Sequence, residues 1–262
     1  MSARKLAFAA AALLAASAAP ALAQSIAITG GKVVIGDGSD PIEGGTVLVQ
    51  DGKVIAAGRN VAVPAGVRTI DARGKWVTPG LVVAVTDLGL IDVEAVDDSN
   101  DTEADKSPFN AALDISAAIN PDAQPIRISR GGGVTRAAVA PMGTRSIFGG
   151  QGAVIDLGAD PQPVTAPRAF QYVELGETGA RRAGGSRVAS YVELHNALGE
   201  AKELALAPAG PRRDDVLLTR RDAQALVAVV TGKQPLYVRV ERAADIRMVL
   251  GLRGDYSALR LV

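Results

Sequence analysis

The chain has 262 residues, with 28 basic and 28 acidic side chains and therefore no net charge. This balance, without a dense stripe of Lys and Arg, argues against a nucleic-acid-binding surface. Hydrophobic residues make up 48% of the chain but aromatic residues only 3%, which favours an α/β protein with an aliphatic core. The sequence contains no cysteine, which excludes disulfides and thiolate metal sites.

The first 23 residues have the pattern of a secretory signal peptide. Arg4 and Lys5 give a positive start, residues 6–16 are apolar, and the small residues of Ala21-Leu22-Ala23 suit a cleavage site. The apolar stretch is shorter than the roughly 20 residues that span a bilayer, so a membrane anchor is the less favoured alternative. We predict cleavage after Ala23 and a periplasmic or secreted protein with no further membrane association.

Residues 24–77 have the pattern of a small β-module. Short β-branched runs occur at 32–35 and 46–50, and Asp51-Gly52 separates "TVLVQ" from "KVIAAG", which predicts a tight hairpin. Asp37 and Asp40 suggest calcium, but their spacing fits no calcium loop, and turn chemistry is the favoured interpretation.

Residues 78–262 show a different periodicity. Strands are predicted at 81–86, 134–140, 153–157 and 236–241, helices at 187–205, 222–230 and 243–252, and the start of a strand at 257–262. This alternation of strands and helices predicts parallel βα units. The acidic segment 92–125 is predicted to be a long connection with little regular structure.

Several stretches resemble one enzyme superfamily. "ITGGKVVIGDGSDPIEGGTVLVQDGKVIAAG" and "VPAGVRTIDARGKWVTPGL" resemble the opening of the amidohydrolase superfamily. "GGGVTRAAVAP", "IFGGQGAVIDL" and "PLYVRVERAADI" resemble its imidazolonepropionase-like branch. The resemblance implies an α/β protein with a small N-terminal β-sandwich module followed by a (β/α)8 TIM-type barrel.

The length of the second segment predicts that this barrel is incomplete. A TIM barrel of about 250 residues uses roughly 30 residues for each βα unit, so residues 78–262 would supply about six of the eight units. The sequence also stops within the apolar run "ALRLV". We therefore expect a truncated member of the superfamily.

The resemblance also implies a chemistry, for which the residues of this chain are altered. The superfamily hydrolyses amide or other C–N bonds in small, often cyclic, substrates, with water activated by one or two divalent metals such as zinc. Its first barrel strand usually ends in His-x-His, and the matching positions here are Val85 and Asp87. Valine cannot bind a metal, and one carboxylate alone does not fix a coordination geometry.

A later strand departs from the superfamily in the same way. The branch often has His-x-His-Arg-Ala there, whereas this chain has Arg239-Val240-Glu241-Arg242-Ala243. Alternation places Tyr237, Arg239 and Glu241 on one face of the strand. The favoured interpretation is an internal Arg239–Glu241 pair that reaches Asp87.

Two alternatives remain for these residues. Asp87 and Glu241 are the candidate metal ligands, because carboxylate oxygens bind divalent cations. Arg239 is the candidate substrate-binding residue, because a guanidinium pairs well with a carboxylate.

Three other features favour structural roles. His195 is the only histidine and lies on the apolar face of a predicted helix, where packing is more common than ligation. The acidic run 97–105 lacks the glycine that a calcium loop requires, so a solvated loop is favoured. The segment 181–187, rich in Arg and Gly, suggests an anion-binding turn, but a surface loop that starts a helix is favoured.

Two hypotheses of function follow, and neither assigns a catalytic residue. The first is an exported amidohydrolase-family hydrolase of C–N bonds with impaired or no metal-dependent catalysis. The second is a non-catalytic periplasmic binding or scaffold protein on the same fold. Both imply a small-molecule substrate or ligand, and neither implies a nucleic acid.

Overall fold

The computed structural model describes residues 25–93, 96–211 and 213–262. The chain divides into two compact units, one that ends at Pro79 and one that comprises Gly80–Val262. The predicted signal peptide, with its cleavage site after Ala23, lies outside the described residues. Within the described ranges, no helix is both long and apolar enough to cross a bilayer.

The first unit contains one five-stranded sheet. Its strands are β1 (Ile26–Val33), β2 (Ile42–Gln50), β3 (Lys53–Gly58), β4 (Arg68–Asp71) and β5 (Trp76–Val77). They follow the order β3-β2-β1-β4, with β5 also paired to β1. The hairpin predicted between β2 and β3 is confirmed. Both turn residues have positive φ, 51° at Asp51 and 72° at Gly52, as the favoured two-residue turn requires.

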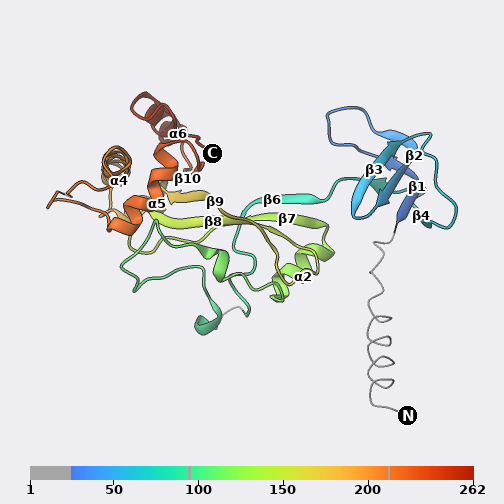
Figure 1. Ribbon diagram of the computed structural model, residues 1–262, viewed down its shortest axis with the longest axis horizontal. Coiled ribbons are helices and arrows are strands. Elements are labelled where there is room, and N and C mark those ends of the chain that lie inside the picture. Colours follow the sequence, from blue (N-terminus) through green and yellow to red (C-terminus); the bar gives the residue numbers. More distant parts are fainter. Residues whose placement is uncertain (1–24, 94–95, 212) are drawn as a thin grey trace, which may run out of the picture. The chain divides into compact units, whose positions relative to one another are not determined.

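The second unit contains a five-stranded sheet of mixed direction (Figure 1). Its strands, in the order β10-β9-β8-β7-β6, are β6 (Leu81–Thr86), β7 (Val134–Val139), β8 (Phe148–Asp156), β9 (Val164–Glu174) and β10 (Leu236–Arg239). The pairs β6–β7 and β9–β10 are parallel, whereas β7–β8 and β8–β9 are antiparallel. Four strands therefore share one direction, and β8 runs the opposite way.

The reversed strand corrects the prediction of purely parallel βα units. The connections 140–147 and 157–163 on either side of β8 contain no helix. A parallel crossover needs about a dozen residues or more, and antiparallel neighbours need far fewer. Beyond β10, residues 260–262 begin a further parallel pairing, in which Leu236 N donates to Arg260 O at 2.8 Å and Val238 N to Val262 O at 2.9 Å.

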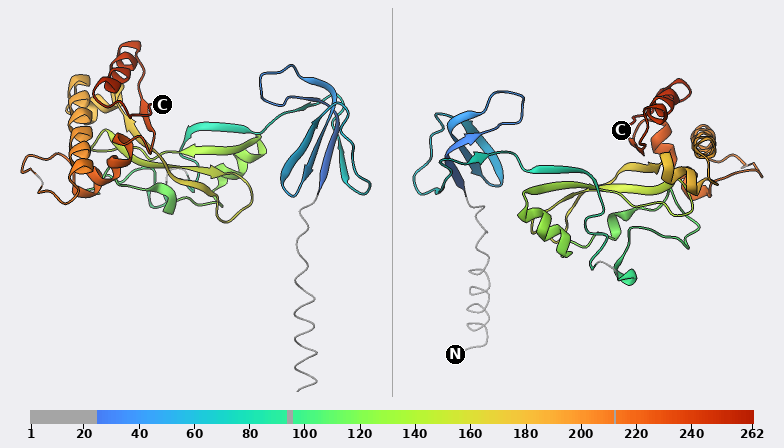
Figure 2. Two further views of the ribbon diagram at one scale, coloured as in Figure 1. Left: turned by 45° about the horizontal axis from the view of Figure 1, so that its top comes forward. Right: turned by 180° about the vertical axis from the view of Figure 1, so that it is seen from behind.

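Helices gather beside β9 and β10, as the views of Figure 2 show. They are α3 (Gly176–Arg182), α4 (Arg187–Leu206), α5 (Arg220–Val230) and α6 (Ala243–Gly251), followed by the 3-10 turn η3 (Leu252–Gly254). The three helices predicted from periodicity correspond to α4, α5 and α6. Ser186 and Thr219 cap α4 and α5 by accepting backbone N–H bonds, which is a typical N-terminal signal.

Most of the hydrophobic core lies between these helices and the sheet. The largest buried cluster joins β8, β9 and β10 to α4, α5 and α6, and includes Phe148, Val173, Leu194, Leu198, Leu226, Leu236 and Leu252. A second cluster lies at the other end of the sheet around Ile126 and Ile155. A third, smaller cluster includes Phe170 and Tyr172 of β9, with Tyr237 of β10 packed against it.

The segment 92–125 is more ordered than its composition predicts. It contains the 3-10 turns η1 (Asp97–Ser99) and η2 (Ile115–Ala117), and its end enters helix α2 (Gln124–Gly131). Pro125 stands in the first turn of α2, where proline is tolerated because that N–H needs no helical partner. Buried Asp222 of α5 accepts N–H bonds from Asn110 at 2.9 Å and Ala112 at 2.8 Å, which ties this segment to the helices.

Candidate functional site

The C-terminal ends of β6, β9 and β10 are the candidate site. A groove with a cavity volume of about 440 Å³ is lined there by Ala84, Val85, Tyr172, Tyr237, Val238, Arg239 and Val262. These three strands run in the same direction, because β8 is the only reversed strand of the sheet. In barrel and open α/β folds, ligands bind where the C-terminal ends of such strands meet.

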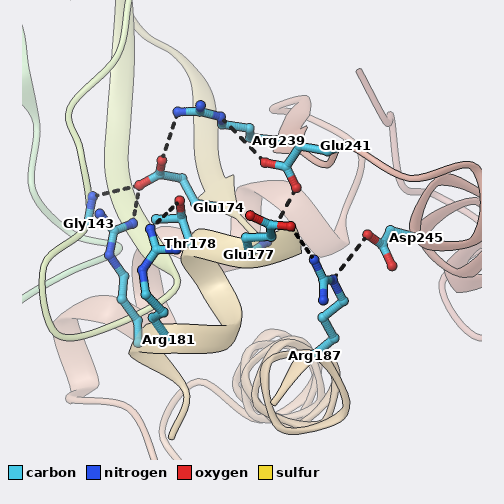
Figure 3. A network of polar contacts seen from close by, with 10 residues as sticks. Gly143, Glu174, Glu177, Thr178, Arg181, Arg187, Arg239, Glu241 and Asp245 are labelled. Carbon is cyan, nitrogen blue, oxygen red and sulfur yellow. Dashed lines mark hydrogen bonds and ion pairs between the residues drawn. The ribbon is translucent and has the colours of Figure 1, made fainter. Parts of the chain in front are cut away.

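A buried carboxylate lies beside this groove, at the last residue of β9. The Glu174 side chain is 2% exposed and is held from three sides (Figure 3). Arg182 Nη1 and the Gly143 N–H, at 3.3 Å, both donate to its Oε2. Arg239 Nη1 lies 3.4 Å from its Oε1. A buried charge is tolerated when it is paired and hydrogen-bonded in this way.

Glu241 follows β10 and approaches the start of α3. Its Oε2 accepts the Glu177 N–H at 3.3 Å, and its Oε1 lies 3.9 Å from Arg239 Nε. Gly176, with φ of 57°, makes this approach possible, because a Cβ there would collide with the Glu241 carboxylate. A glycine is required here for two reasons, the left-handed backbone and the close contact.

The polar network continues to α4 and α6. Arg187 at the start of α4 lies 3.2 Å from Glu177 and 3.5 Å from Asp245 (Figure 3). Arg242 adds a 3.9 Å contact with Glu177. In the segment 181–187, both Arg182 and Arg187 thus pair with carboxylates of the protein itself, which favours a structural role over an anion-binding turn.

The residues predicted from the superfamily's metal positions are brought together only in part. Val85 and Arg239 line the same groove, and Glu241 pairs with Arg239. Asp87 is exposed and lies just past the end of β6 at Thr86. Among the described residues, its carboxylate makes no ion pair with Arg239, so the predicted reach of the Arg239–Glu241 pair to Asp87 is not seen.

These residues do not fit a divalent metal. Within the described parts of the chain, no group of three or more His, Cys, Asp or Glu side chains converges to hold one. A guanidinium stands at the later strand end, beside two carboxylates that it already contacts. At about 4 Å, the repulsion between +1 and +2 charges is on the order of 8 kcal/mol at an effective dielectric near 20. We therefore derive no reaction step through a metal.

His195 lies among aromatic side chains. Its ring centroid is 4.6 Å from that of Tyr191, in an edge arrangement, and 5.9 Å from that of Tyr256. These ring contacts indicate that His195 has a packing role.

Glu174 is the central residue of the site, and the sequence prediction did not identify it. The strand that carries it was also not predicted. One signal was available: Tyr172 and Glu174 are two residues apart, shortly before Leu175-Gly176, and in a strand they therefore share a face. Burial raises the pKa of the Tyr172 hydroxyl, and the Glu174 carboxylate acts in the same direction. Tyr172 therefore stays neutral at physiological pH.

The fold of the chain is similar to that of an amidohydrolase of known structure, in agreement with the resemblance seen in the sequence. Its structure is similar to that of an amidohydrolase from Thermotoga maritima MSB8, with a TM-score of 0.74 and 23% sequence identity. The similarity covers 90% of this chain and 63% of that protein, so this chain spans less than two thirds of the similar protein's length. Neither a protein-family model nor a curated protein matches the chain.

Two further solved structures match at lower similarity. A second amidohydrolase has a TM-score of 0.42 and 17% sequence identity, and the match covers 87% of this chain and 59% of that protein. Phenylurea hydrolase B has a TM-score of 0.36 and 15% sequence identity, and the match covers 88% of this chain and 58% of that protein. TM-scores below 0.5 do not establish a shared fold, so nothing about fold or function is inferred from these two structures.

Proposed function

We propose that this protein is an amidohydrolase of the imidazolonepropionase-like branch whose 262 residues do not by themselves support metal-dependent catalysis. By resemblance, the reaction of its class is hydrolysis of C–N bonds in small or cyclic amides. The amidohydrolase fold supports the class, and the quoted sequence stretches support the branch.

One observation supports the absence of metal-dependent catalysis in this proposal. Arg239 stands where the branch has an imidazole, and its guanidinium contacts both Glu174 and Glu241. The carboxylates of Glu174 and Glu241 are thus already paired within the protein. At the end of β6, Val85 offers no ligand atom, and within the described ranges Asp87 belongs to no group of three or more His, Cys, Asp or Glu side chains.

The first prediction concerns the metal content and activity of the wild-type protein. Purified wild-type protein should contain far less than one zinc per chain and should not hydrolyse a panel of cyclic amides and N-acyl amino acids. The measurements are elemental analysis and product detection with and without a chelator. Stoichiometric zinc, together with turnover that a chelator abolishes, would contradict the proposal.

A second candidate function is non-catalytic binding of a small molecule, and the groove favours it. Its volume of about 440 Å³ lies within the range of small-molecule sites. Neither candidate predicts turnover by these 262 residues, so ligand affinity in metal-depleted buffer is the measurement that tests the binding function.

We also propose the finer architecture that the sequence predicts. In it, residues 24–77 form a small β-sandwich module, and residues 78–262 form part of a TIM-type barrel, with about six units. The similarity to the Thermotoga protein and the shared direction of β6, β7, β9 and β10 support the barrel part of this architecture.

Export is the remaining part of the proposal. The charged start, the apolar stretch and the Ala-x-Ala sequence together support cleavage after Ala23. When the protein is expressed in a bacterium with its first 23 residues, N-terminal sequencing should find Gln24 first. Finding the intact Met1 terminus on protein recovered from the periplasm would contradict this prediction.

A further inference from the structure

Another groove, called here the helix groove, lies between α4 and α5 (Figure 1). Its cavity volume is about 410 Å³, which is within the range of small-molecule sites. One wall consists of Leu204, Ala205 and Pro208, at the end of α4 and just after it, and the other wall belongs to α5 and the turn that follows it. None of its lining residues also lines the groove at the strand ends.

The α5 wall is a row of side chains that follows one face of the helix. Arg220, Gln224, Ala228 and Thr231 line the groove at steps of three or four residues, and such residues are neighbours on a helix surface. From Arg220 to Thr231 the row extends about 16 Å along the helix axis. Lys233 N donates to Ala228 O at 2.9 Å, which holds Lys233 against the end of α5. The groove is therefore elongated, with Arg220 at one end and Lys233 at the other.

The middle of the helix groove is apolar. Leu204 and Ala205 of α4 and Val227 and Ala228 of α5 line it there, and all four are half-buried. Half-buried aliphatic side chains leave apolar surface that a ligand can remove from water. An occupant therefore needs an apolar body in the middle.

Both ends of the helix groove are basic. Arg220 and Lys233 are exposed, and among the described residues neither pairs with a carboxylate. Arg220 is oriented by a hydrogen bond from its Nη2 to Pro208 O at 2.8 Å. The only acidic residue of α5, Asp222, is buried and accepts N–H bonds from the segment 110–112. No carboxylate lines the groove, so its charge suits an anionic group at each end.

We propose that the helix groove binds a linear dicarboxylate with an apolar spacer. One carboxylate pairs with the Arg220 guanidinium and the other with the Lys233 ammonium, and charged donors of both kinds bind carboxylates well. The spacer covers the aliphatic middle of the groove. Because the two grooves share no residue, this site is independent of whether the strand ends hold a metal.

The test is a titration of the full chain at low ionic strength, followed by the amide NMR shifts of α5. The probes are decanedioate, which has a carboxylate at each end, decanoate, which has one, and decanediol, which has none. Decanedioate should bind about fivefold more tightly than decanoate, and decanoate about fivefold more tightly than decanediol, as expected for exposed ion pairs. Butanedioate should bind at least about tenfold more weakly than decanedioate, because it lacks most of the apolar spacer.

Substitutions assign the two ends. Lys233→Gln breaks no side-chain hydrogen bond among the described residues, and it should abolish the preference for decanedioate over decanoate. Arg220→Gln should do the same but also loses the bond to Pro208 O, so Arg220→Lys, which keeps the charge, should retain most of the preference. Arg221→Gln is the matched control, since Arg221 is an exposed cation of α5 that does not line the groove. It should leave all affinities unchanged.

Three results would overturn the site. The first is no binding of decanedioate by the wild type, and the second is equal wild-type affinity for decanedioate and decanoate. The third is a preference for decanedioate that persists in Lys233→Gln or is lost equally in Arg221→Gln, since the net charge of the protein would then explain binding. Zinc content and turnover, which test the proposed function, bear on none of these outcomes.

Discussion

Glu174→Ala is expected to lower the free energy of unfolding of the second unit by about 3–5 kcal/mol, the range for removing one partner of a buried ion pair. Arg182, whose side chain is only 15% exposed, would keep its charge without the carboxylate that neutralises it. The Gly143 N–H would also lose its acceptor. Urea denaturation followed by far-UV circular dichroism measures the change.

Glu241→Ala is the matched control. It removes a carboxylate from the same network, but one that is 43% exposed and 3.9 Å from its guanidinium partner. Exposed pairs of this kind contribute about 1 kcal/mol or less. If the two substitutions destabilised the protein equally, burial would not be what makes Glu174 important.

The sequence predicts most of the elements around the site because local signals mark them. The Asp51-Gly52 turn defines the first hairpin, and Ser186 and Thr219 mark the starts of two helices. Strand β9 escapes prediction because Pro167 and Arg168 interrupt its apolar alternation, and Arg168 has a φ of 47°. With β9 unassigned, the antiparallel pairs that flank β8 could not be predicted either.

Prediction of the site succeeds in part. Arg239 is the last residue of β10 and Glu241 lies two residues further on, and the two side chains do lie together as predicted. Val85 and Asp87 have the same spacing, but β6 ends at Thr86, and a turn in which Leu90 N donates to Asp87 O begins there. The alternation therefore stops before Asp87. Local alternation places Glu174 on the same face as Tyr172, but it does not encode the partners of Glu174, Gly143 and Arg239, which are distant in sequence.

The largest effect we expect concerns zinc affinity, and it depends on Arg239. The double variant Val85→His/Asp87→His restores the His-x-His of the superfamily but should still lack stoichiometric zinc and hydrolase activity. Two imidazoles fall short of the three protein ligands that catalytic zinc normally has, and the guanidinium lines the same groove as position 85.

Adding Arg239→His to the double variant should raise zinc affinity by about 100-fold. Over separations of about 4 to 8 Å, a +1 charge repels a +2 charge by on the order of 8 to 4 kcal/mol at an effective dielectric near 20. Because the Arg239 side chain is 56% exposed, solvent reduces this repulsion, and about 100-fold corresponds to about 2.7 kcal/mol. The third imidazole and the release of Glu174 and Glu241 from the guanidinium act in the same direction.

Arg247→His in the same double variant is the control, since Arg247 is exposed on α6 and does not line the groove. It adds an imidazole and removes a guanidinium without changing the site, so its zinc affinity should equal that of the double variant. Elemental analysis and competition titration measure zinc binding without requiring turnover. Tight zinc binding by the double variant alone would show that Arg239 does not oppose a cation. Equal gains from both triple variants would show that the added histidine acts from outside the groove.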